Sequence, residues 1–381
     1  MKFPHKQKQQ GMALIMLVFI VGLAAAGYLL HALNPATVKI ERDKKTAAAL
    51  AEAKAALIGW SVKNNTPGQL PCPEDLELIG LATEGQSMLS CNDPNKRIGR
   101  LPWRTLGLGD IRDGNGDKLW YALSDGFRKQ PINSDTLAQL TVDGIAGSAV
   151  AIIFSAGSAL NGQSRPIPTA ATPPDIAQYL DGSNSDNDNA FVTSGVLGSF
   201  NDQLLSITHY DLFQLVEKRV AGEALKCLDI FASGAGGKYP WPAELDSSAP
   251  VNYSGDVGAS MGRFPDSPMG GNWPGACAIP VGGGGWWSSW KEIVFFAVAD
   301  EYKPTGTAAP CGTCLTVNPP SVSPDKKVVV MVAGKAFANQ SRTTNAHKGA
   351  VTNYLEAPNN GGVSFAQQHA TSSFNDVVVY R

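Results

Sequence analysis

Charged residues are scarce in this sequence, and the two signs nearly balance. Lysine and arginine total 31 and aspartate and glutamate total 33, which gives a formal net charge of −2 at pH 7. Proteins that bind nucleic acid need a clustered basic surface to neutralise phosphates. The basic stretch Lys39–Lys45 also contains acids, so it fits the solvated face of a helix. We therefore expect no nucleic acid among the partners.

Histidine is also rare, and no recognisable catalytic constellation is present. The five histidines show no metal-ligand spacing. The motif Gly-x-Ser-x-Gly around Ser260 lacks the preceding strand and following helix that a nucleophile elbow needs. We expect no enzymatic activity.

The N-terminal region, in contrast, contains a long run of apolar residues. From Met12 to Leu33 the only polar side chain is His31. This length matches the ~20 residues that a helix needs to span ~30 Å of hydrocarbon. Lysines at positions 2, 6 and 8 precede the run and no acid does, which predicts a cytoplasmic N-terminus.

Three interpretations of this run are open. It could be a secretory signal with an apolar core at 12–23 and small residues for cleavage at 24–27, or it could be a simple membrane anchor. However, the run continues past the alanines, and after Pro35 an amphipathic helical pattern extends to about Trp60. An apolar helix followed by an amphipathic one suits a rod packed in a bundle, which is the third interpretation.

The stretch "QQGMALIMLVFIVGLAAAGYLL" resembles the N-terminus of the type IV pilin and pseudopilin family, over roughly residues 5–60. The resemblance implies that residues 1–11 are a leader, cut after Gly11 by a prepilin peptidase that then methylates Met12. The apolar helix would serve first as a membrane anchor and then as filament core. The expected location is the bacterial inner membrane, with the N-terminus cytoplasmic and the heads in the periplasm or at a filament tip.

The same resemblance implies partners and a role. The partners would be other pilin or pseudopilin subunits, the prepilin peptidase and an inner-membrane assembly platform, in a type IV pilus or a type II secretion-like machine. The family usually has a glutamate five residues past the cut, where this chain has Met16. A buried carboxylate is costly unless it is paired, so its absence favours a minor subunit at the tip. The alternative is a membrane- or filament-anchored adhesin.

The remainder of the chain repeats itself. Segments recur in the same order, with offsets that drift only slightly. The matching pairs are "LPCPEDL" (70–76) with "YPWPAEL" (239–245), "KLWYALSDGFRK" (118–129) with "EIVFFAVADEYK" (292–303), "SAGSALNGQSR" (155–165) with "VAGKAFANQSR" (332–342), and "SFND" at 199–202 and 373–376. Such ordered self-similarity indicates a tandem duplication.

We predict an α+β fold in which each copy is a helix on a small antiparallel sheet. The expected division is an N-terminal helix over 12–64, a first lobe over 65–210 and a second over 211–381. Helices should open the copies at Thr46–Asn64 and Asp211–Phe231. Strands are expected at 118–123, 149–154, 292–299, 327–334 and 377–381.

The six cysteines are even in number and, beside an export signal, favour disulfides in an oxidising compartment. Cys72 and Cys91 are expected to pair within the first copy. The "PCGTC" motif could also be redox-active or half a zinc site, but its loop context fits neither well. Two further disulfides of open connectivity are expected among Cys227, Cys277, Cys311 and Cys314.

Two stretches are candidate binding sites. In "DIRDGNGDKLW", oxygen-bearing side chains alternate around glycines in the way that a calcium loop requires, although an Asp/Asn/Gly turn explains them too. These side chains are Asp110, Asp113, Asn115 and Asp117. Tryptophans set among glycines could form an exposed patch for protein or sugar, or close over a thin core. They are Trp273, Trp286, Trp287 and Trp290.

Overall fold

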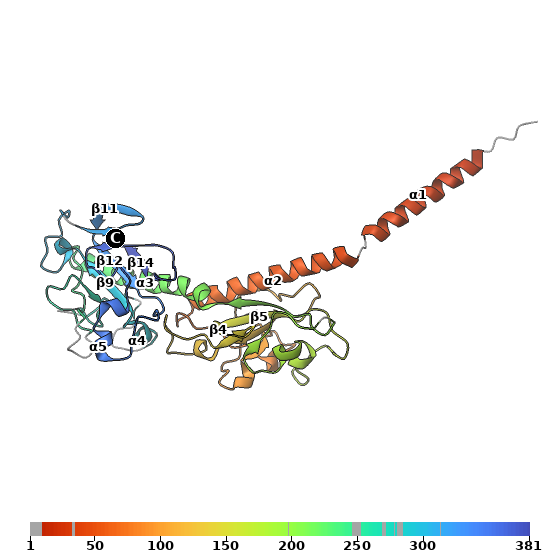
Figure 1. Ribbon diagram of the computed structural model, residues 1–381, viewed down its shortest axis with the longest axis horizontal. Helices are drawn as coiled ribbons and strands as arrows, with labels where there is room; N and C mark the ends of the chain where they lie inside the picture. The colour runs from red at the N-terminus through yellow and green to blue at the C-terminus, as the bar shows by residue number, and fades with distance from the viewer. Residues whose placement is uncertain are drawn as a thin grey trace, which may run out of the picture.

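The molecule is an elongated rod of helices with two lobes at one end (Figure 1). The computed structural model describes residues 10–32, 35–196, 198–245, 253–268, 272–277, 279, 285–312 and 314–381. Most of the expected leader, residues 1–9, therefore lies outside the described residues. Gly11 and Met12 lie in the first helix, and the surroundings of the Met12 side chain are not described.

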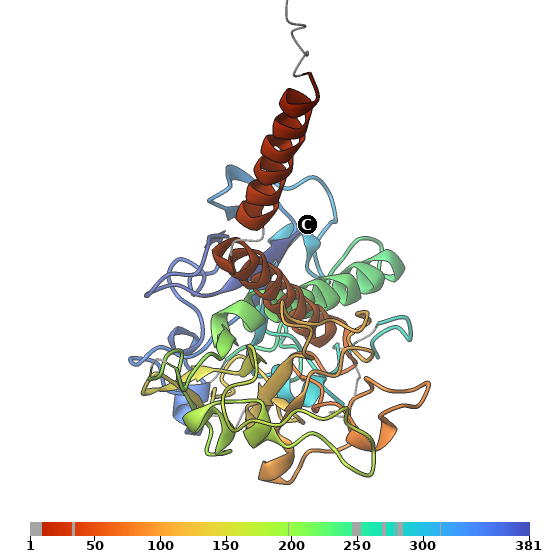
Figure 2. The same cartoon turned by 90° about the vertical axis from the view of Figure 1, so that its right-hand side faces the viewer.

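Helix α1, Gln10–Ala32, stands apart from both lobes (Figures 1 and 2). Its described large apolar side chains, from Leu14 to Tyr28, are each between 59% and 77% exposed. Among the residues that the structure describes, no helix combines the length and apolar character needed to cross a membrane.

Helix α2, Pro35–Lys63, changes character along its length. Its first turns are exposed, whereas its second half packs against the first lobe. The buried side chains recur every three or four residues, which places them on one face of the helix. They are Ala49, Leu50, Ala53, Leu57 and Ile58.

Lobe one consists of the second half of α2 and residues 65–207. Its main sheet is antiparallel, in the order β1-β2-β5-β7. The strands are β1 Ile98–Arg100, β2 Trp120–Leu123, β5 Ala151–Ser155 and β7 Gln203–Ile207. A second sheet, in the order β4-β3-β6, comprises β3 Leu140–Val142, β4 Ile145–Ala149 and β6 Ala190–Phe191, with β3 and β6 parallel.

The main sheet of lobe one is buried on both faces. Tyr121 and Ile153 belong to the core beneath α2, whereas Trp120 and Ile152 belong to a second core on the opposite face, which includes Leu140 from β3. Because successive side chains of a strand point to opposite faces, this two-sided burial explains why the central strands β2 and β5 are almost entirely apolar.

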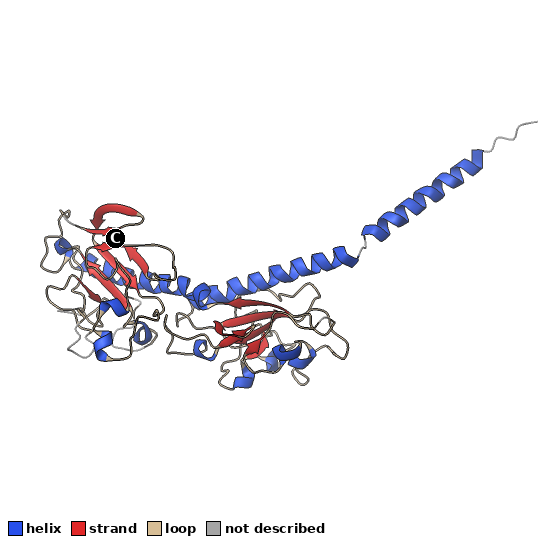
Figure 3. Ribbon diagram, viewed as in Figure 1, coloured by secondary structure: helices blue, strands red, loops and turns tan. Residues whose placement is uncertain are grey.

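Lobe two, residues 209–381, repeats this plan (Figure 3). Helix α3, His209–Gly234, begins with a capping box between Thr208 and Asp211. The antiparallel sheet β14-β12-β9-β8 consists of β8 Met261–Arg263, β9 Val294–Val298, β12 Val328–Val332 and β14 Val377–Tyr380. The sheet β11-β10-β13 consists of β10 Leu315–Val317, β11 Ser321–Lys326 and β13 Ser364–Phe365, with β10 and β13 parallel.

Short helices complete both lobes. Two are α-helical, α4 Trp287–Trp290 and α5 Asn345–Lys348. The 3-10 turns are Leu76–Leu78, Pro94–Lys96, Asp125–Phe127, Ile176–Gln178, Gly182–Ser185, Asp300–Tyr302 and Val351–Asn353.

The α+β class is confirmed, and every strand expected from the sequence is present. One detail of the repeat is wrong by one residue. Arg100 pairs with Trp120 in lobe one, and Arg263 pairs with Phe295 in lobe two, so Trp120 corresponds to Phe295, not to Val294. A continuously apolar strand has no alternation to fix its register, and a slip of one residue exchanges its two faces.

All six cysteines are in disulfides, as expected. The pairs are Cys72–Cys91, Cys227–Cys277 and Cys311–Cys314. The first closes a loop of lobe one. The second ties α3 to a loop of lobe two, and the third closes the C-x-x-C loop on itself.

The two lobes share one hydrophobic core. Phe213 of α3 lies between Phe127 of lobe one and Trp290 of lobe two, with ring centroids 6.0 and 6.1 Å away. Lys54 of α2 forms an ion pair with Asp211 of α3 at 2.8 Å. This shared packing makes the two lobes one head.

Candidate functional site

The predicted calcium loop is organised by hydrogen bonds within the protein. Asp113 is fully buried, and its Oδ1 accepts from the backbone N–H groups of Asn115 and Asp117, both at 2.9 Å. Its Oδ2 accepts from Ser155 Oγ at 2.6 Å. The carboxylate that would be the central ligand thus holds the turn together and ties it to β5.

The other acids of this loop also have protein partners. Asp117 pairs with Arg165 at 2.6 Å, and Asp110 pairs with Arg112 at 2.7 Å. Among the described residues, no group of three or more His, Cys, Asp or Glu side chains could hold a metal ion. The structure therefore does not assemble the calcium site that the spacing suggested, because these carboxylates are directed to cations and N–H groups of the chain itself.

The calcium-loop residues instead attach lobe one to α2. Gly114 N donates to Thr46 Oγ1 at 2.9 Å. A Cβ at Gly114 would lie 2.1 Å from the Arg42 carbonyl oxygen, so only glycine permits this approach.

The predicted tryptophan patch is wrong, because all four side chains are at most 8% exposed. Trp273 stacks on Phe264 with centroids 4.5 Å apart, and Trp287 donates from Nε1 to Asp266 at 3.2 Å. These aromatic residues fill the lobe-two core where the loop segments supply few other apolar side chains.

In both lobes an arginine joins the segment after a central strand to a 3-10 turn. In lobe one, Arg165 donates to the carbonyls of Gly157 (2.8 Å), Gln178 (2.9 Å) and Tyr179 (3.2 Å). Its guanidinium also lies over the Tyr179 ring, 5.0 Å from the centroid. The one carboxylate that it binds, Asp117, comes from the same lobe.

Arg342 occupies the equivalent position in lobe two. It donates to the carbonyls of Gly334 (3.1 Å), Asn353 (2.8 Å) and Tyr354 (3.4 Å), and lies 4.7 Å from the Tyr354 centroid. Its carboxylate partner is Asp135 at 2.9 Å, which belongs to lobe one. We call the arginine with its three carbonyls and its tyrosine the socket.

Loop 131–136 of lobe one inserts into the lobe-two socket. Asp135 Oδ1 also accepts from Ala336 N at 2.9 Å. Beside it, His209 Nε2 donates to the Ser134 carbonyl at 2.8 Å. This plug holds the two lobes in a fixed relation.

Two titratable groups of α3 face the plug and are uncharged at neutral pH. Burial raises the pKa of Glu217 to about 8, and the charge of Arg342 opposes this shift only in part. Burial, with the nearby charge of Lys335, lowers the pKa of His209 to about 4. We call the contact between the plug and lobe two the joint; burial there disfavours the charged forms of both groups.

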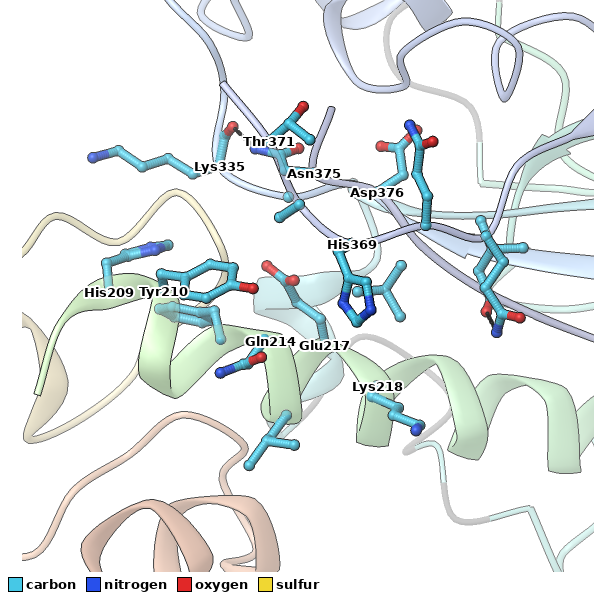
Figure 4. A pocket seen from close by; sticks show the side chains of 18 residues that line it. His209, Tyr210, Gln214, Glu217, Lys218, Lys335, His369, Thr371, Asn375 and Asp376 are labelled. Atoms are coloured by element: carbon cyan, nitrogen blue, oxygen red, sulfur yellow. Dashed lines mark hydrogen bonds between the residues drawn. The ribbon is translucent and has the colours of Figure 1, made fainter. Parts of the chain in front are cut away.

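A groove of about 430 Å³ opens next to this joint (Figure 4). It lies between α3 residues 209–218, the loop 367–371 and residues 375–378 at the start of β14. In Figure 4 the Glu217 carboxyl lies between Tyr210 and His369. The groove thus combines an aromatic wall, amide groups and two nearby lysines.

The sequence did not single out the socket or the groove. The identical "QSR" in the repeat pair 155–165 and 332–342 was a signal for the two socket arginines. No signal pointed to Asp135, whose role depends on a contact between lobes.

Comparison with protein-family models, curated proteins and solved structures found no match to this chain.

Proposed function

We propose that this chain is a non-enzymatic pilin-like subunit that joins a filament or a type II secretion-like machine through α1. The observation that carries the proposal is the uninterrupted apolar surface of α1, exposed on all sides of the helix from Leu14 to Tyr28. A helix that is apolar all round belongs inside a membrane or a bundle.

The free energy of exposing so much apolar surface to water favours burial of this helix in lipid or against other helices. Burying one large apolar side chain stabilises a protein by ~1.5–3 kcal/mol relative to leaving it in water. The described part of α1 exposes an unbroken series of such side chains from Leu14 to Val21. Lipid before assembly and neighbouring α1 helices afterwards would both provide the cover. The apolar run 12–33 extends past the residues whose side chains are described, at both of its ends.

The head supports an extracytoplasmic location for the rest of the chain. Three disulfides form among the six cysteines, which is typical of oxidising compartments. We place the N-terminus in the cytoplasm and the head in the periplasm or at a filament tip. The partners would be other pilin-like subunits, a prepilin peptidase and an assembly platform.

Processing would remove residues 1–11, and Met12 would become the methylated N-terminus. Met16 places a neutral side chain where a carboxylate would need a partner from a neighbouring subunit. A subunit with no neighbour on that side has nothing to neutralise, so we place it at the tip.

Mass spectrometry of the N-terminal peptide from membrane-extracted protein tests the proposal. We expect a peptide that begins at Met12 with a mass increase of one methyl group. A terminus at Gly27 would indicate a secreted product, and an intact Met1 a simple anchor, and either would overturn the proposal. A Gly11→Arg variant, expected to stay unprocessed, is the matched control.

A further inference from the structure

The groove on lobe two is accessible from solvent. Tyr210 and Leu215 on its α3 side are 49% and 46% exposed. Its opposite wall, the loop 367–371, is exposed along its whole length. No described part of the chain fills the space between them, so an external ligand can enter.

The charges around the groove favour an anion. Lys218 and Lys335 line it, are exposed, and form no ion pair with any described residue. Two acids, Glu217 and Asp376, also line it, and burial disfavours the charged form of each. Burial raises the pKa of Glu217, and burial together with the neighbouring Glu356 raises that of Asp376.

The groove is continuous with a contact that already binds a carboxylate. Gly334 and Lys335 line the groove, and the next residue, Ala336, donates its N–H to Asp135. Arg342 binds the same carboxylate. The plug of lobe one therefore shows which chemistry this edge of lobe two accepts: an aspartate presented by a loop.

We propose that the groove binds an acidic segment of a partner protein. Lobe two would recognise the carboxylates of this segment beside the place where it already binds Asp135. The rim lysines Lys218 and Lys335 would meet its acidic side chains. Tyr210 and Leu215, both about half exposed in the groove, would contact its apolar side chains. The ligand class is thus a peptide that carries both acidic and apolar side chains. This inference concerns lobe two alone and does not depend on the role proposed for α1.

Fluorescence anisotropy on the detergent-solubilised full-length protein tests the inference. The probes are a fluorescein-labelled peptide of alternating glutamate and valine and the same peptide with lysine in place of glutamate. We expect the acidic peptide to bind about tenfold more tightly at low salt, and the difference to shrink as salt screens the lysines. Equal binding of the two peptides, or binding of neither, would overturn the inference.

Charge reversal locates the site. In Lys218→Glu/Lys335→Glu, the acidic peptide should lose about tenfold in affinity and the lysine peptide should gain. The matched control, Lys63→Glu/Lys96→Glu, makes the same change of net charge on lobe one and should leave both affinities unchanged. Equal losses in the two double variants would show that only overall charge matters.

An oligogalacturonate competitor separates the ligand classes. If the acidic saccharide binds with an affinity that depends on Lys218 and Lys335 while the peptide does not, the proposed peptide ligand is wrong. Near-ultraviolet circular dichroism of each variant shows whether lobe two remains folded, and the gain for the lysine peptide cannot arise from misfolding.

Discussion

The two lobes have the same plan but fill their sockets differently. In lobe one, Arg165 binds Asp117, which belongs to the same lobe. The turn that contains Asp117 also contacts α2, through the hydrogen bond from Gly114 to Thr46. In lobe two, Arg342 binds Asp135 from lobe one. The same chemical contact is thus internal in one lobe and forms the joint between lobes in the other. Two lobes with the same plan can gain a fixed interface when one lobe supplies the group that the other takes from within itself.

Breaking the joint at its arginine tests this difference between the lobes most directly. Arg342→Ala removes the charge that Asp135 faces and leaves the carbonyls of Gly334, Asn353 and Tyr354 without this donor. We expect a loss of about 2 kcal/mol in the free energy of unfolding, because the carbonyls lose a charged hydrogen-bond donor. The Asp135 side chain is 34% exposed, so water partly solvates its carboxylate once the arginine is gone. Urea unfolding followed by tryptophan fluorescence measures it.

Arg342→Lys is the control for this prediction. It keeps the charge but loses the planar fork, so it should fall between wild type and Arg342→Ala. An unchanged urea midpoint in Arg342→Ala would show that the plug contributes nothing to the joint.

Removing a disulfide should destabilise the two lobes to different extents. Cys227–Cys277 closes a separation of 50 residues, whereas Cys72–Cys91 closes one of 19. The chain-entropy model gives about 4 kcal/mol for the longer loop and about 3 kcal/mol for the shorter. Paired Cys→Ser variants compared by urea unfolding should therefore rank lobe two as the more affected, and the reverse order would contradict the entropic explanation.

The joint also predicts a pH dependence that belongs to lobe two. The raised pKa of Glu217, about 8, means that the folded state keeps a proton that the unfolded state loses above pH 4.5. Stability should therefore fall as pH rises from about 4.5 to about 8. Glu217→Gln should flatten this fall and stabilise the protein by about 2 kcal/mol at pH 8.

Urea unfolding at several pH values measures this effect, with the exposed Glu52→Gln on α2 as the control. The same slope in wild type and Glu217→Gln would exclude Glu217 as its source. His209 should give the opposite pH dependence, because its pKa is lowered to about 4. The stability of the folded protein that depends on neutral His209 should be lost as pH falls from 6.5 toward 4.

The smallest effect should come from the ion pair at the rim of the joint. Lys54 and Asp211 are each about one-quarter exposed, at 24% and 27%. Pairs of this kind contribute about 0.2–1 kcal/mol and are weakened by salt. Lys54→Met should therefore lower the urea midpoint only slightly, and less at high salt than at low salt. If Lys54→Met lowered the free energy of unfolding as much as Arg342→Ala, the exposed ion pair would contribute as much to the joint as Arg342 does.

Much of the fold was predictable because the strands and helices carry strong local patterns. The β12 run and the amphipathic spacing of α3 are recognisable without any tertiary contact. The small sheets, such as β10 with β13, were missed because their strands have two or three residues and are joined only by distant segments.

The candidate sites were predicted less well, for a related reason. Residue type alone does not show which partner a side chain meets. Asp113 has the chemistry of a calcium ligand, yet Ser155 and two backbone N–H groups satisfy it. Trp287 has the chemistry of a binding platform, yet it is buried beside Phe264.

The sequence by itself determined the apolar α1, the repeated plan of helix and sheet, and the oxidised state of the cysteines, because these follow from composition, periodicity and internal repetition. Only the tertiary structure decided the use of Asp135. A carboxylate becomes a plug only when another lobe places a guanidinium and an N–H within 3 Å of it, and that placement results from the packing of α3 against α2.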